Sequence, residues 1–247
     1  MGARSAGRPD TGVKAHTRAV VHPGGRLGEL HCTPPLTVRR VRADRSDECA
    51  LCLVGSAAGP LAGDELIAEL TVEQGARATL TATGASIAQG RGGPAASMAW
   101  HLNIGAGAHL TADPGPLIVC EGSRVDVEIA ISLAADSHLE WRELVVLGRS
   151  TDVTPGAATI GWDVTRAGRP LLRQSVDLTG PDWAHLIAGH RVLATALLTG
   201  PDVAARTVVH SRTSVAQQLD EHTVLLTVLG DSAAEVTRNL TALRAAS

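Results

Sequence analysis

The sequence predicts an all-β protein: a single domain, mostly strand with a few short helices, whose β-hairpins stack in a solenoid-like arrangement. Many segments alternate apolar and polar residues with a period of two, which is typical of strands with one buried face. Glycine-containing turns separate these segments at short intervals. Three turns of related sequence, at Gly75, Gly107 and Asp136, follow one another about 30 positions apart. A repeat of that length made only of strands indicates stacked layers.

The clearest unit runs from Pro60 to Ser86. Within 65–72 the even positions are apolar and the odd positions are mostly polar, so one face of this strand is expected to be buried. Gln74-Gly75 interrupts the pattern, because glycine accepts the positive φ of a tight reversal. The alternation resumes over 76–82. We therefore expect these two strands to pair as a β-hairpin.

The same alternation predicts the other strands in chain order. They are 36–42, 49–54, 100–104, 108–112, 117–120, 125–133, 139–147, 161–166, 170–178, 191–198, 207–215 and 223–229. Ala167-Gly168 predicts a further hairpin turn, and Ser232 followed by Glu235 forms a capping box that opens a C-terminal helix over 232–244. Residues 1–24 are polar and basic and are expected to be a flexible tail, which leaves 25–247 as the β domain.

Two groups of potential metal ligands are interpreted as structural. Stacking of the repeated layers would bring His109 and His138 close together, and we expect imidazoles in structural roles or exposed to solvent there. Cys49 and Cys52 have the spacing of a zinc or redox pair, but no second pair follows. Residues three apart in a strand point to opposite faces, so we expect two buried cysteines in preference to a metal-binding pair.

Composition excludes several classes of function. The chain has 247 residues, a formal net charge of −3, four Trp and no Phe or Tyr, so neither a basic nucleic-acid surface nor an aromatic stacking platform is expected. Lys14 is the only lysine, which excludes a P-loop. No apolar run of about 18 residues and no hydrophobic leader is present, so we expect a cytoplasmic protein with reduced thiols and no membrane contact.

The order of motifs between about Leu30 and Gly200 resembles the urease accessory protein UreD (UreH) family. The motifs are the Gly63-Asp64 turn, Gly75 to Thr81, Gly107 to Pro114, Glu143 to Arg149 and Gly168 to Leu172. This resemblance implies a mostly β, solenoid-like scaffold without enzymatic activity. It further implies that the chain docks on urease apoprotein, binds UreF and through it UreG, and has no tightly bound cofactor, with nickel in transit through an internal tunnel.

The resemblance also nominates site residues. Asp64, Glu143 and Asp113 are candidates for a transient nickel path, with Thr81 and Arg149 as polar-path or partner-binding residues. Two alternatives stay open from the residues alone: a β-solenoid interaction module unrelated to urease, and a β-helical carbohydrate-active enzyme. The scarcity of aromatic residues disfavours the enzyme.

Overall fold

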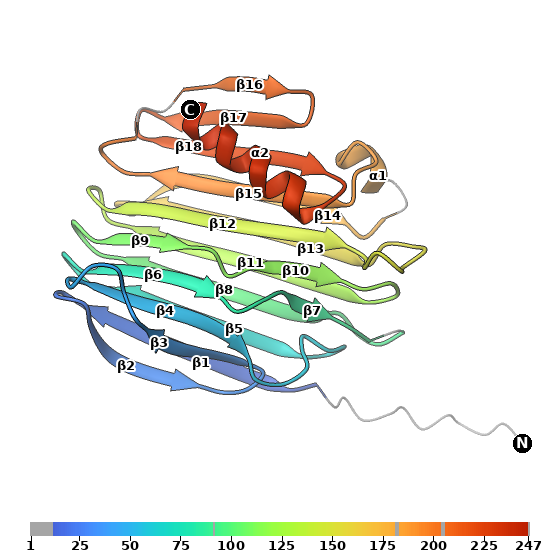
Figure 1. Ribbon diagram of the computed structural model, residues 1–247, viewed down its shortest axis with the longest axis horizontal. Helices are drawn as coiled ribbons and strands as arrows, with labels where there is room; N and C mark the ends of the chain where they lie inside the picture. The colour runs from blue at the N-terminus through green and yellow to red at the C-terminus, as the bar shows by residue number, and fades with distance from the viewer. Residues whose placement is uncertain (1–11, 91, 181–182, 204–205, 247) are drawn as a thin grey trace, which may run out of the picture.

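Two stacked β-sheets make up most of the computed structural model, which describes residues 12–90, 92–180, 183–203 and 206–246 (Figure 1). Sheet A has seven strands in the order β14-β13-β11-β8-β5-β1-β2. Their bounds are β1 Lys14–His22, β2 Arg26–Cys32, β5 Glu65–Val72, β8 Ala96–Ile104, β11 Arg124–Leu133, β13 Ala157–Arg166 and β14 Arg169–Leu178.

Sheet B runs in the order β16-β17-β18-β15-β12-β9-β6-β4-β3, with β10 paired to both β12 and β7. The bounds are β3 Leu36–Val41, β4 Glu48–Gly55, β6 Arg77–Ala82, β7 Ser86–Ala88, β9 His109–Ala112, β10 Pro116–Val119, β12 His138–Leu147, β15 Val192–Thr199, β16 Val208–Ser211, β17 Ser214–Asp220 and β18 Thr223–Gly230. The two helices are α1, Trp183–Leu186, and α2, Ala233–Ala246.

The chain alternates between the sheets from one layer to the next. β5, β8, β11 and β13 lie in sheet A, while β4, β6, β9 and β12 lie in sheet B. Within each sheet these successive strands pair in parallel. Each layer therefore stacks on the one before it, which confirms the predicted mostly β, solenoid-like single domain.

The predicted hairpin within Pro60–Ser86 is wrong in its pairing. β5 pairs in parallel with β1 and β8, and β6 pairs in parallel with β4 and β9. Gly75 has the expected positive φ of +69°, but the turn carries the chain from one sheet to the other. Alternation reports which face of a strand is buried and does not report which strand accepts its hydrogen bonds. The hairpin predicted around Ala167-Gly168 is confirmed, since β13 and β14 pair antiparallel.

The main core fills the space between the sheets. The apolar face predicted for β5, namely Leu66, Ala68, Leu70 and Val72, is at most 4% exposed. Three tryptophans, Trp100, Trp141 and Trp162, lie in the same core. A second cluster lies on the outer side of sheet B, where Val236, Leu240 and Leu243 of α2 pack on β15 and β18. Helix α2 starts close to its predicted cap, where Ser232 Oγ accepts a hydrogen bond from the Glu235 amide at 3.3 Å.

The prediction of a flexible tail to residue 24 is wrong over Lys14–His22. These residues form β1, which lies between β2 and β5 in sheet A, whereas 1–11 lie outside the described residues. Ala15, Ala19 and Val21 of β1 are buried, so this strand contributes to the core. Within the described part of the chain, neither helix has the length and apolar character needed to cross a membrane.

Both ends of the stack consist of antiparallel strands. At one end β2 pairs with β1 and β3 pairs with β4. At the other end β14 pairs with β13, and β16 pairs with β17. Three of these four pairings contain a register shift, the exception being β3 with β4.

Candidate functional site

Sheet B is interrupted at two adjacent layers. β6 ends at Ala82 before β7 begins at Ser86, and β9 ends at Ala112 before β10 begins at Pro116. The strands on either side of the interruption pair, β6 with β9 and β7 with β10, but the residues 83–85 and 113–115 leave the ladders. Gly115 has a φ of +79°, and a Cβ there would lie 2.7 Å from the Gly84 carbonyl oxygen. The two segments therefore approach more closely than a side chain at position 115 allows.

A depression of about 440 Å³ lies on the outside of this break. Thr81 and Asp113 line it, together with Gly84 and Gly115. The exposed Asp113 accepts a hydrogen bond from the Gly115 amide at 3.1 Å, and its other carboxylate oxygen lies 4.0 Å from Nη1 of Arg142. Asp113 thus supplies a carboxylate, and Thr81 a hydroxyl, at the outer opening of the break, which we call its mouth.

A cavity of about 20 Å³, room for about one water molecule, lies beneath the break. Gly115 lines both this cavity and the outer depression, and Ser86, Trp100, Trp141 and Glu143 also line the cavity. The Trp141 Nε1 is buried and has no partner among the residues that the structure describes. An unpaired donor next to a carboxyl group is the kind of environment that holds an ordered water.

Glu143 is the acidic group of this cavity. It lies on the face of β12 that points between the sheets, where Trp162 of β13 donates a hydrogen bond from Nε1 to its Oε2 at 3.1 Å. Burial raises the pKa of Glu143 to about 8, while the hydrogen bond from Trp162 opposes that rise. The group is therefore mostly protonated and uncharged at neutral pH. Sequence reasoning nominated Glu143 but missed Trp162, although both occupy inward positions in alternating strands.

The structure brings three of the five nominated residues to the break, namely Thr81, Asp113 and Glu143, and places Asp64 and Arg149 elsewhere. Asp64 is 2% exposed in the turn before β5. Its Oδ1 accepts a hydrogen bond from the Val13 amide and its Oδ2 one from the Leu61 amide, each at 2.8 Å. Both carboxylate oxygens therefore hold the backbone of this turn.

Arg149 lies in the loop after β12 and pairs with Asp152. Its Nη2 is 3.0 Å from Oδ1 of Asp152, whose side chain is 3% exposed. Hydrogen bonds from the Arg149 side chain and from backbone amides of Arg149 and Glu121 hold the pKa of the Asp152 carboxyl well below its usual range. This arrangement fixes the loop 149–152.

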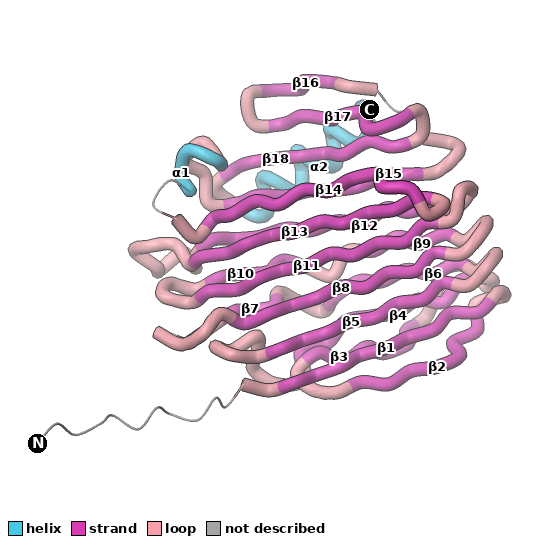
Figure 2. The backbone as a smooth tube through the Cα atoms, turned by 180° about the vertical axis from the view of Figure 1, so that it is seen from behind, coloured by secondary structure: helices cyan, strands magenta, loops and turns pink. Residues whose placement is uncertain are grey.

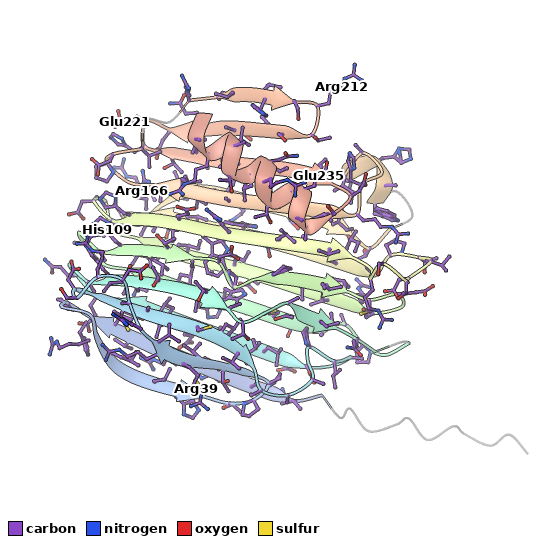
Figure 3. All side chains as sticks on the ribbon, in the orientation of Figure 1. Arg39, His109, Arg166, Arg212, Glu221 and Glu235 are labelled. Carbon is purple, nitrogen blue, oxygen red and sulfur yellow. The ribbon has the colours of Figure 1, made fainter. Side chains whose placement is uncertain are left out.

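The predicted proximity of His109 and His138 is confirmed. Their rings stack with centroids 3.9 Å apart and planes 9° apart, where β9 and β12 begin. His109 is labelled in Figure 3. Arg77 Nη2 lies 3.1 Å from His109 Nε2, so that nitrogen acts as the acceptor. Burial, followed by the nearby His138 and Arg77, lowers the pKa of His109.

The expectation that both cysteines are buried is confirmed for Cys49, whereas Cys52 is half-buried. Over the described ranges, no three His, Cys, Asp or Glu side chains come together in a way that could hold a metal ion. Glu140 was not anticipated. It is 8% exposed and accepts hydrogen bonds from Arg142, with Arg244 of α2 on its other oxygen.

Fold and site together define a two-sheet β-solenoid protein in which a break in one sheet lies above the half-buried Glu143. The family model described as "UreD urease accessory protein" matches residues 13–247. The chain therefore belongs to the UreD family of urease accessory proteins, and its role is an accessory one in urease maturation. This finding favours the urease interpretation over the two alternatives considered from the sequence.

Curated relatives agree with the family match. Urease accessory protein UreD of Streptomyces avermitilis is 34% identical over 237 residues, covering 92% of this chain and 90% of the relative. UreD 3 of Streptomyces griseus is 34% identical over 202 residues, covering 76% and 78%. UreD of Frankia alni is 30% identical over 295 residues, covering 98% and 96%.

Proposed function

We propose that this protein is a non-catalytic scaffold of the cytoplasm that docks on urease apoprotein and, together with UreF and UreG, helps deliver nickel to the urease active site. The observation that carries the proposal is the family match over residues 13–247. Nickel is cargo in this scheme and no tightly bound cofactor is required. The break in sheet B supports the proposal by supplying oxygen ligands at a surface opening.

The proposed contact point for nickel is the mouth formed by Thr81 and Asp113. Asp113 is exposed and offers a carboxylate oxygen, while the Thr81 hydroxyl contacts the Leu51 carbonyl at 3.4 Å. A site with only a few oxygen ligands has a low affinity for a divalent transition metal, so release of the metal to a partner costs little free energy. Asp64 is left out of the proposed path because both of its oxygens hold backbone amides.

Glu143 would be the next group that the ion meets, in the inner cavity below Gly115. A protonated carboxyl is a poor cation ligand, so an ion reaching Glu143 has to displace its proton. The inner cavity has room for about one water, and passage of a hydrated ion therefore requires residues 83–85 and 113–115 to move apart. Docking of a partner on the break is the event proposed to open it.

Complementation tests this function directly. The gene is introduced into a strain that lacks its own UreD but retains urease, UreF and UreG, and urease activity is measured. Restored activity is expected, together with copurification of the chain with urease apoprotein or UreF. An Asp113→Asn variant should lower activation, whereas the exposed control Glu221→Gln should not. Absence of both complementation and copurification would contradict the proposal.

A further inference from the structure

Within the described residues, α2 packs on the other sheet and α1 reaches only β14, so the outer face of sheet A carries no covering helix over its central strands. In Figure 2 the strands of sheet A cross the front of the molecule, with α2 behind them. Helix α2 contacts β15, β17 and β18 of sheet B, and α1 contacts β14 at the end of sheet A. The strands β5, β8, β11 and β13 therefore present their outward side chains to solvent.

Charge on this face has a definite arrangement. Its central strands carry five outward carboxylates, which are Glu65, Glu69, Asp126, Glu128 and Asp163; we call these the acidic face. Arginine or lysine side chains flank it on the strands at either side. Lys14 pairs with Glu65 at 2.9 Å, Arg18 lies 3.9 Å from Glu69, and Arg173 pairs with Asp163 at 2.6 Å.

Two carboxylates at the centre are left without an ion pair. Asp126 and Glu128 of β11 are both exposed, and within the described residues neither has a hydrogen bond or salt bridge from its side chain. Arg124, two residues before Asp126, is the outward cation of β11; the pKa of the Asp177 carboxyl on β14 is lowered mainly by hydrogen bonds from Thr179, with a smaller contribution from the charge of Arg124. The centre of the acidic face thus carries two negative charges that are available to a partner.

Small side chains surround these carboxylates. In the strand register Glu128 lies between Ala99 of β8 and Gly161 of β13. Ala130, the next outward residue of β11, lines a depression of about 500 Å³ together with Glu69, His101 and Asp163. Arg18 and Arg173, which lie beside Glu69 and Asp163, line it as well. A partner side chain can therefore reach the backbone of sheet A beside Glu128.

Gly161 is informative because the fold does not require a glycine there. A Cβ at this position would meet only the Val127 carbonyl oxygen, at 3.8 Å, which is an ordinary contact. Glycine inside a strand weakens it, and it often marks a place where another molecule approaches the backbone. Ile67, in register with Ala99 and 37% exposed, adds an apolar contact to the same area.

We propose that the acidic face is a docking surface for a partner protein that presents arginine or lysine side chains, which pair with Asp126 and Glu128 beside the small residues Ala99, Ala130 and Gly161. The proposal rests on the proposed function in one respect: urease apoprotein and UreF are the partners tested first. Charge complementarity of this kind sets association rate and orientation. The break in sheet B belongs to the other sheet, so docking here leaves it accessible.

The test compares three variants of the full chain in complexes with urease apoprotein and with UreF. Glu128→Arg should weaken one of the two complexes by about 10-fold or more and reduce its salt dependence. Gly161→Val should weaken the same complex while thermal stability is kept or raised, because a β-branched residue suits an extended strand. Glu221→Arg, a matched charge reversal in the turn before β18, should leave affinity unchanged.

A probe independent of both partners separates this proposal from the proposed function. Hexa-arginine is added to the free chain, and carbodiimide labelling of carboxylates is read by mass spectrometry. Protection of Asp126 and Glu128 supports the docking surface even if neither urease apoprotein nor UreF binds. The proposal is overturned if these two residues stay fully reactive, or if Glu128→Arg and Gly161→Val both leave every measured complex unchanged.

Discussion

The Glu143 carboxyl group and the Trp162 indole join the two sheets at their interior, with 3.1 Å between Oε2 and Nε1. Other side chains around them, including Trp100 and Trp141, are apolar or nearly so. The charged form of Glu143 is disfavoured there because burial outweighs this one hydrogen bond. This pair makes the interior of the protein sensitive to pH.

Stability should fall with rising pH because of Glu143. Its pKa is about 8 in the folded chain against an ordinary value of 4.5, so the folded state holds a proton that the unfolded state has lost between these values. The contribution is complete below pH 4.5 and is lost as pH rises through 8, a change on the order of a few kcal/mol. Glu143→Gln should flatten the dependence of Tm on pH between 5.5 and 8.5. An unchanged slope would contradict the assignment, and Glu221→Gln is the exposed control.

His109 should change the pH dependence of stability in the direction opposite to Glu143. Its pKa is lowered from 6.5, so below that pH the unfolded chain binds more protons than the folded chain and stability is lost on acidification. This effect opposes that of Glu143, so between pH 7.5 and 5.5 the change in Tm of His109→Gln should be more favourable than that of the unmodified protein. His210→Gln, at an exposed position of β16, should behave like the unmodified protein. Equal changes in Tm in all three would show that the stacked pair does not contribute in this pH range.

Asp64 should matter for stability. In Asp64→Asn only one side-chain oxygen remains, so one of the amides of Val13 and Leu61 loses its acceptor. The expected cost is about 1–3 kcal/mol, measured by urea denaturation. Asp113→Asn, on the exposed rim, should stay within about 0.5 kcal/mol. If both variants cost the same, the turn does not depend on the Asp64 carboxylate.

The close approach at the break predicts a difference between two glycines. Gly168→Ala places a Cβ at a φ of +74° with nothing within 4 Å, so its cost is backbone strain alone, about 1 kcal/mol. Gly115→Ala has a similar φ of +79° and adds a contact of 2.7 Å with the Gly84 carbonyl. Urea denaturation should show a larger loss for Gly115→Ala. Equal losses would mean that the segments 83–85 and 113–115 separate easily.

Most strands were predictable from the sequence because each has one apolar face, and β5 buries the face its alternation indicates. The turn repeat at Gly75, Gly107 and Asp136 also predicted that His109 and His138 would meet. Pairing was not predictable in the same way. A turn between sheets and a turn within one sheet have similar local sequences, so only distant contacts separate a solenoid layer from a hairpin.

The site was predictable in part. Asp113, Thr81 and Glu143 lie near one another because two adjacent layers of sheet B are interrupted side by side, between β6 and β7 and between β9 and β10. No local sequence pattern indicates that the two interruptions coincide. The contact between Glu143 and Trp162 could have been anticipated, since both occupy the apolar face of alternating strands. Asp64 holds the backbone of its turn with both carboxylate oxygens, and the sequence does not distinguish that role from cation binding, because an acidic residue after glycine in a turn can do either.

The antiparallel strands at both ends of the stack have a consequence for assembly. Parallel layers offer a free row of amide and carbonyl groups at each end, on which the layers of another copy could add without limit to give a filament. Here hairpins close both ends, with register shifts at β2, β14 and β16 and a proline at the start of β14. These three edge strands are poor templates for strand addition, whereas β3 keeps a regular register with β4. Growth of the stack is therefore disfavoured at three of its four sheet edges, which leaves recognition of other proteins mainly to its faces.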